Sequence, residues 1–147
     1  MLKFSKKERL CSKIVIEEVL ANKKTIYYQP FKLMYLIHKP VESISTDFNS
    51  NIEQVEEAWA KIAIVVPKRL FKRAVDRNAL KRIIRESYRL NKEILIEHLA
   101  QHNCHISLFL IYTDKNKADF QFIEPKIKVL LQQLIKRINF ESNQNNN

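Results

Sequence analysis

The stretch VDRNALKRIIRESYRLNK, residues 75–92, combines an apolar helical period with a large excess of positive charge. At about 100° per residue, one side of the predicted helix is mostly apolar and is formed by Leu80, Ile83, Ile84, Ser87, Asn91, Ile94 and Leu95. The opposite stripe is polar and strongly cationic, and consists of Asn78, Lys81, Arg82, Arg85, Arg89 and Lys92. This pattern predicts a helix that packs on a sheet with one side and presents cations on the other.

Positive charge is concentrated in blocks of the chain. Residues 61–92 carry 11 basic and 2 acidic side chains, residues 1–39 carry 9 and 3, and residues 40–60 carry 0 and 5. The two acids of the basic block, Asp76 and Glu86, are too few to neutralise the cationic stripe by ion pairing within the helix. Such an excess favours a polyanionic partner, and the preference for Arg favours nucleic acid over a membrane. An ordinary solvated helix face remains the alternative.

Composition excludes several classes of protein. The chain has no glycine, which excludes glycine-dependent phosphate loops and the nucleophile elbow of esterases. Two distant cysteines, Cys11 and Cys104, argue against a disulfide framework and favour a reducing cytoplasm. The longest apolar run, residues 106–112, is too short to span a bilayer, and the N-terminus lacks an apolar signal core. We therefore expect a soluble cytoplasmic protein.

Together with this helix, the rest of the sequence predicts an α+β fold, with about four strands and three helices in a single domain, residues 1–140. Residues 31–38 alternate as a strand, with Phe31, Leu33 and Tyr35 on one face. The continuous apolar character of residues 59–67 predicts a central strand. The remaining predicted elements are a helix at 12–21, a minor strand at 26–28, an acidic insertion loop at 40–58, a strand at 105–113, a helix at 122–138 and a disordered tail at 141–147.

Residues 67–92 resemble the signature of the protein subunit of bacterial ribonuclease P. That signature has a basic loop, then Ala-Val, one variable residue, Arg-Asn-Arg, Lys-Arg and Arg-Glu. The matching residues here are Lys68, Arg69, Lys72, Arg73, Ala74, Val75, Arg77, Asn78, Lys81, Arg82, Arg85 and Glu86. The sequence departs from it at Ala79, which replaces the last Arg of the triplet and lies off the cationic stripe. The basic loop also lacks the usual glycine and has Lys72 instead.

The resemblance implies a compact α/β sandwich with a left-handed crossover around the basic helix. It also implies a catalytic RNA partner, with one protein per RNA. This RNA is expected to hold the catalytic Mg²⁺ and to remove the 5′ leader of precursor tRNA. The implied contacts with the catalytic RNA are Lys68, Arg69, Arg73, Arg77, Asn78, Lys81, Arg82, Arg85 and Arg89. The leader is expected in a cleft between the first helix and the sheet, at Ile16, Leu20, Lys32 and Met34. Since the family often has aromatic residues at three of these positions, less base stacking is expected here.

Other signals in the sequence are weaker. His98, His102, Cys104 and His105 could suggest a metal site, but their spacing fits no standard zinc module. Tyr27, Tyr28 and Phe31 could stack on bases or belong to the core. A generic RNA- or DNA-binding module is the alternative function. A self-contained nuclease is a third, but the sequence offers no carboxylate cluster for a metal.

Overall fold

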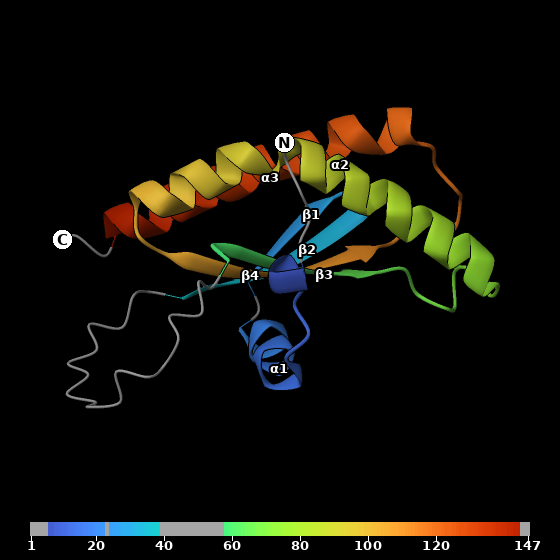
Figure 1. The fold of residues 1–147 in the computed structure, drawn as a ribbon, viewed down its shortest axis with the longest axis horizontal. Helices are drawn as coiled ribbons and strands as arrows, with labels where there is room; N and C mark the ends of the chain where they lie inside the picture. Colours follow the sequence, from blue (N-terminus) through green and yellow to red (C-terminus); the bar gives the residue numbers. More distant parts are fainter. Residues whose placement is uncertain (1–5, 23, 39–57, 145–147) are drawn as a thin grey trace.

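The computed structural model describes residues 6–22, 24–38 and 58–144, with side chains described as far as residue 139. One four-stranded sheet has helices on both faces (Figure 1). Its strands are β1 (Thr25–Tyr28), β2 (Phe31–His38), β3 (Ala60–Val65) and β4 (His105–Tyr112), in the order β1-β2-β4-β3. Helices α2 (Ala74–Gln101) and α3 (Phe120–Gln144) cover one face, and α1 (Lys13–Ala21) covers the other. The predicted α+β class is confirmed.

Strand alternation divides the side chains between these two faces. Phe31, Leu33 and Tyr35 of β2 are each 1% exposed and belong to the core beneath α2 and α3. The antiparallel register places them beside Tyr112, Leu110 and Leu108 of β4, which are in the same core. The residues between them, including Lys32 and Met34, therefore lie on the α1 side. The predicted faces of this strand are confirmed.

Strands β3 and β4 are parallel neighbours, and the chain between them crosses over the sheet as α2. The basic helix thus forms the crossover that the resemblance implies, while its left-handedness remains a prediction. The central position predicted for residues 59–67 is wrong, because β3 lies at the edge of the four-stranded sheet. Its apolar character fits this position because it packs against α2, and Ala60 and Ile62 are nearly fully buried.

The outer edge of β3, which does not face β4, is covered by the segment that follows the 3₁₀ turn η1 (Lys6–Glu8). Arg9 forms an isolated parallel bridge with Ile62, and the Leu10 N–H donates to the Ile62 carbonyl at 3.0 Å. An uncovered edge strand would present unpaired backbone groups. The N-terminal segment therefore acts as a short additional partner for β3.

Both long helices extend beyond their predicted ends. Helix α2 continues past Lys92 and ends at Gln101. Asn103, two residues after the helix, has a left-handed φ of 49°. Asparagine tolerates this conformation better than most residues, and it takes the place that glycine often fills after a helix. Helix α3 runs to Gln144, past the predicted start of the tail at 141. Nearly all of the predicted acidic loop, residues 40–58, lies outside the described residues.

Within the described part of the chain, no helix combines the length and apolarity needed to cross a membrane.

A buried ion pair attaches the N-terminal segment to α2. The Lys92 ammonium donates to the Glu8 carboxylate, and the two side chains are 5% and 10% exposed. Tyr88 lies one turn earlier on α2, where burial and the nearby Glu8 carboxylate raise its pKa. The pair joins residues 84 positions apart in the sequence.

We expect Lys92→Met to lower the free energy of unfolding by about 3–5 kcal/mol, because it leaves the Glu8 carboxylate buried without its cation. The double variant Glu8→Leu/Lys92→Met should recover most of this loss, since it removes both charges. Urea unfolding of the wild type, both single variants and the double variant measures this. Equal losses in Lys92→Met and the double variant would contradict a desolvated pair.

Candidate nucleic-acid interface

The loop before α2 is held by hydrogen bonds to its backbone. Pro67 closes a turn, with its carbonyl accepting from the N–H groups of Leu70 and Phe71. Arg77, in the first turns of α2, donates from Nη1 to the carbonyls of Phe71 and Lys72, both at 2.9 Å. Because the ends of the loop are fixed in this way, its cationic side chains project outward from a defined backbone, and those exposed to solvent are Lys68, Arg69, Lys72 and Arg73.

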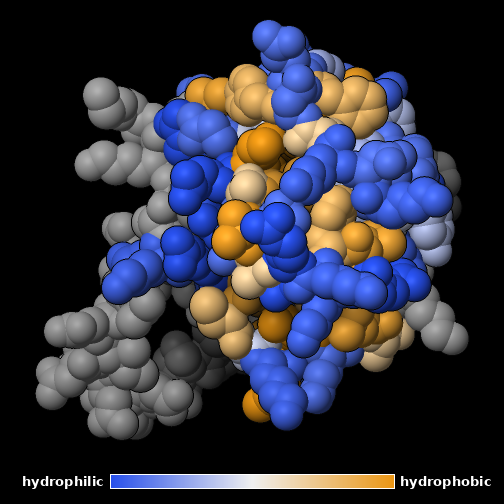
Figure 2. Space-filling view, turned by 90° about the vertical axis from the view of Figure 1, so that its right-hand side faces the viewer, coloured by the Kyte–Doolittle hydropathy of each residue, from blue (hydrophilic) through white to orange (hydrophobic). Residues whose placement is uncertain are grey.

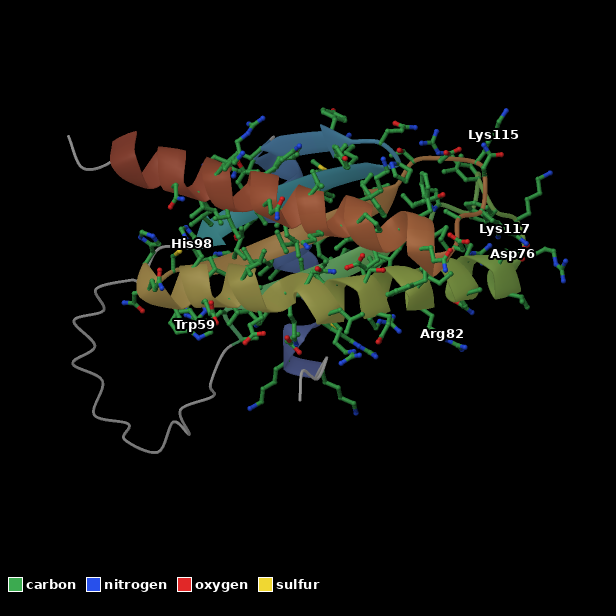
Figure 3. The ribbon with its side chains drawn as sticks, turned by 90° about the horizontal axis from the view of Figure 1, so that it is seen from above. Trp59, Asp76, Arg82, His98, Lys115 and Lys117 are labelled. Carbon is green, nitrogen blue, oxygen red and sulfur yellow. The ribbon has the colours of Figure 1, made fainter. Side chains whose placement is uncertain are left out.

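These loop cations continue onto the side of α2 that faces away from α3. Figure 3 shows Arg82 projecting from this side of the helix. Asn78 and Arg82 are exposed, whereas Lys81, Arg85 and Arg89 are partly buried. We call the combined set the basic surface: Lys68, Arg69, Lys72, Arg73, Asn78, Lys81, Arg82, Arg85 and Arg89. In Figure 2, hydrophilic side chains surround exposed apolar ones at the end of the molecule where α2 begins.

Three basic residues of α2 have roles within the protein: two from the predicted cationic stripe, and Arg77 from the implied RNA contacts. The prediction that Lys92 lies on the exposed cationic stripe is wrong, because Lys92 is buried against Glu8. Arg89 forms two hydrogen bonds to Glu86, from Nε at 2.9 Å and Nη2 at 2.5 Å. The expectation that ion pairing within the helix leaves the stripe unneutralised is therefore wrong at Arg89. Arg77 holds the preceding loop, as described above, and is partly buried.

The Arg89–Glu86 pair also changes the acid–base behaviour of both groups. Hydrogen bonding from Arg89 lowers the pKa of Glu86, and the same interaction raises the pKa of Arg89. The Glu86 side chain is 46% exposed and the Arg89 side chain is 29% exposed, so solvent screens the pair and it adds little to stability. Its consequence is local, because Glu86 offsets the charge of the basic surface at its C-terminal end.

Ala79 lies on a different side of α2 from the basic surface. It lines a small hollow with Asp76, Lys117 and Ala118, next to the loop before α3. Asp76 and Lys117 form an ion pair at 2.6 Å, and the hydrogen bond from Lys117 lowers the pKa of Asp76 (Figure 3). The predicted position of Ala79 off the cationic stripe is therefore confirmed.

On the opposite face of the sheet, α1 packs against β2 and β4. Val19 is the helix residue that is completely buried, at 0% exposure, and Met34 of β2 is 9% exposed. Ile16 is partly buried and Leu20 is 41% exposed, so both lie at the margin of this packing. Of the four residues predicted to contact the leader, Met34 has the least surface left to offer a ligand.

An aromatic residue that the sequence left undecided lies on this same face. Tyr27 of β1 is directly opposite Lys32 in the antiparallel register, and it is 72% exposed. The Lys32 Nζ atom lies 5.6 Å from the centre of the Tyr27 ring. Phe31, by contrast, belongs to the core, and Tyr28 lies on the α3 side beside Lys126. We call Ile16, Leu20, Tyr27 and Lys32 the α1-side surface.

His98 lies at the far end of the molecule from Arg82 (Figure 3). The rings of His98 and His102 are 4.4 Å apart, and burial together with His102 lowers the pKa of His98. His105 instead stacks on Trp59 at 4.6 Å, and Cys104 is buried. Among residues 6–22, 24–38 and 58–144, no group of three or more His, Cys, Asp or Glu side chains could hold a metal ion.

Comparison with known proteins gives consistent matches. The family model described as Ribonuclease P matches residues 4–135. A curated relative, the ribonuclease P protein component of Porphyromonas gingivalis, is 28% identical over 120 residues, covering 82% of this chain and 77% of the relative.

Two solved structures share the fold. The RNase P protein from Thermotoga maritima matches with a TM-score of 0.58 and 20% identity, over 86% of this chain and 96% of that one. The RNase P protein of Staphylococcus aureus matches with a TM-score of 0.56 and 16% identity, over 86% and 94% of the two chains. At these identities the likeness establishes the fold alone.

Proposed function

Because the chain belongs to the ribonuclease P protein family, we propose that it binds the catalytic RNA with its basic surface and the 5′ leader of precursor tRNA with its α1-side surface. Membership makes the chain a subunit of an endoribonuclease ribonucleoprotein with an RNA partner. The proposal assigns the two RNA contacts to opposite sides of the sheet. The observation that carries it is the continuity of exposed cations from the loop before α2 onto that helix.

The basic surface suits the phosphate backbone of a folded RNA. Lys68, Arg69 and Arg73 project from a loop whose backbone is fixed, so less conformational entropy is lost on binding than from a mobile segment. Arg82 and Asn78 extend the surface along a rigid helix. Arginine pairs bidentately with phosphate oxygens, whereas lysine acts as a point charge. These contacts position the protein and give binding a strong dependence on salt.

The α1-side surface suits a single strand of RNA. Tyr27 offers an exposed ring on which a base can stack, and Lys32 beside it offers a cation for a phosphate. Ile16 and Leu20 add apolar contact at the margin of α1. Tyr27 thus compensates in part for the aliphatic residues at the other positions. Met34 contributes by packing between α1 and the sheet rather than by contacting RNA.

We assign the chemistry of cleavage to the RNA. We expect one protein per RNA, with Mg²⁺ held mainly by the RNA, where it would supply Lewis-acid chemistry at the scissile phosphate. The described side chains do not fit a metal site of their own, as their carboxylates, histidines and cysteines form no suitable cluster. The protein's share is therefore to bind and orient the two RNAs.

The function is tested by reconstitution. The protein alone should not cleave precursor tRNA, whereas protein, catalytic RNA and Mg²⁺ together should release the 5′ leader at a single position. Gel analysis of the products, and the mass of the complex, measure activity and stoichiometry. Cleavage by RNA-free protein would point to a self-contained nuclease. Binding of many unrelated RNAs, with no effect on cleavage, would point to a generic module.

Replacing Lys81 and Arg82 by alanine should weaken binding of the catalytic RNA and leave the fold intact, because both are outside the core. Each lost phosphate contact should reduce the slope of log K against log salt by about one unit. Filter binding at several salt concentrations measures this. Lys128→Ala on the exposed side of α3 is the control for each single replacement, since it also removes one positive charge. Equal slopes in all variants would make the basic surface an ordinary solvated face.

In the assembled ribonucleoprotein, Tyr27→Ala should weaken binding of precursor tRNA by roughly 1–3 kcal/mol, about 5- to 150-fold in Kd, if one base stacks on the ring. Lys32→Ala should weaken the same complex. Mature tRNA, which lacks the leader, should bind all variants equally. Phe122→Ala is the matched control, because Phe122 is an exposed aromatic residue on α3, across the sheet. If Tyr27→Ala weakens both tRNAs alike, the leader does not lie on this surface.

A further inference from the structure

The N-terminal segment and α2 form a seam along the edge of β3. Glu8 is fixed to α2 by its buried pair with Lys92, and Arg9 and Leu10 are fixed to Ile62 of β3 through the backbone. Arg9 is thus held between two attachment points, although its side chain is exposed. Its guanidinium therefore starts from a defined backbone position at the edge of the sheet.

Arg85 of α2 reaches the same seam. Counting around the helix from Ile84, which is completely buried, Arg85 lies about 100° and Lys92 about 80° away on the same side. A hollow of about 200 Å³ lies along this seam, with both arginines in its wall. Its lining is completed by Leu10, Cys11, Ile62, Ala63 and Ile64.

The charges around this hollow are of one sign. Burial of Arg85, and the positive charges of Arg9 and Arg82, lower the pKa of the Arg85 guanidinium, so the three groups lie within electrostatic reach of one another. Among the described residues, no carboxylate lines this hollow. Two nearby acids along the chain, Glu8 and Glu86, are paired with Lys92 and Arg89. An anion placed between the guanidinium groups would relieve their mutual repulsion.

A larger hollow elsewhere lacks this character. It has a volume of about 680 Å³ and lies between α2 and the loop before α3. Asp114 and Asp119 line it, with Lys117 as its basic residue, and Lys117 already pairs with Asp76. Carboxylates at that position would repel a phosphate.

We propose that Arg9 and Arg85 together bind one phosphodiester group of RNA in the hollow at the β3 edge, with Arg82 beside them. This rests on the proposed function, and adds a phosphate site built by the N-terminal segment. Two guanidinium groups from different elements can bind a phosphate group from two directions, which a single arginine on a helix surface cannot do. The site joins the basic surface on one side of the sheet to the edge that leads toward α1.

A double-mutant cycle tests whether the two arginines share one phosphate. Arg9→Ala and Arg85→Ala should each weaken RNA binding about tenfold, and the double variant only slightly more, rather than about a hundredfold. Arg9→Lys, which keeps the charge but loses the planar fork, should be intermediate. Lys7→Ala removes an exposed charge two residues from Arg9 and should change affinity less than about threefold.

Binding measurements with three RNAs identify which RNA supplies the phosphate. Affinity is measured for the catalytic RNA with free protein, and for precursor and mature tRNA with the assembled ribonucleoprotein. A non-additive loss with any one of them supports the site and identifies the RNA. Multiplicative losses in the double variant, or equal losses from Lys7→Ala and Arg9→Ala, would overturn it. If Arg9→Ala has no effect while Lys81→Ala and Arg82→Ala do, this site fails and the proposed function stands.

Cys11 provides a second readout that needs no variant. It lines the hollow and is exposed, whereas Cys104 is buried. Saturating RNA should slow alkylation of Cys11 by iodoacetamide at least severalfold in the wild-type protein, and mass spectrometry of the Cys11 peptide measures this. Should Arg9→Ala fail to fold, this measurement and Arg9→Lys still decide. An alkylation rate unchanged by RNA would show that the hollow stays open in the complex and would overturn the site.

Discussion

Two parallel neighbouring strands cannot be joined by a tight turn, and this constraint organises the molecule. The chain leaves β3 at one end of the sheet and must enter β4 at the other, so a long segment has to cross the face between them. The 28-residue helix α2 is that segment. Its apolar side is covered by the sheet and α3, and the basic side is consequently directed away from both. The position of the basic surface follows from strand connectivity.

The cations of α2 are divided between stabilising the protein and facing solvent. A helical projection places Lys92 and Arg82 on one stripe, but it contains no information about what arrives from elsewhere in the chain. Glu8 comes from a segment 84 residues away and removes Lys92 from the surface. Arg77 is directed back to two loop carbonyls, which the sequence alone also does not reveal. Charge on a helix face is thus an upper limit on the charge a partner meets.

Much of the fold follows from local patterns in the sequence. The alternation of Phe31, Leu33 and Tyr35 identified the buried face of β2. The period from Leu80 to Leu95 identified the buried side of α2, except at Ile94, which is 42% exposed. The edge position of β3 did not follow from the sequence. Helices, Arg9 and Leu10 cover this strand, so its sequence is as apolar as that of a central strand. Tyr27 could have been assigned only with the β1–β2 register, which pairs it with Lys32. Arg9 was missed because its neighbours, Ile62 and Arg85, are remote in sequence.

The attachment of the N-terminal segment to α2 has a consequence for synthesis on the ribosome. Glu8 and Arg9, which are made before α2, pair with Lys92 and with β3, and the described pairing of β3 is to β4, whose residues end at Tyr112. Contacts of such sequence separation slow folding, because closing the loop between them costs entropy. A nascent chain can therefore display the cations of its N-terminal segment early, but it cannot hold them beside those of α2 until most of the domain has emerged. Translation thus delays the approach of Arg9 to the basic surface until β4 has emerged.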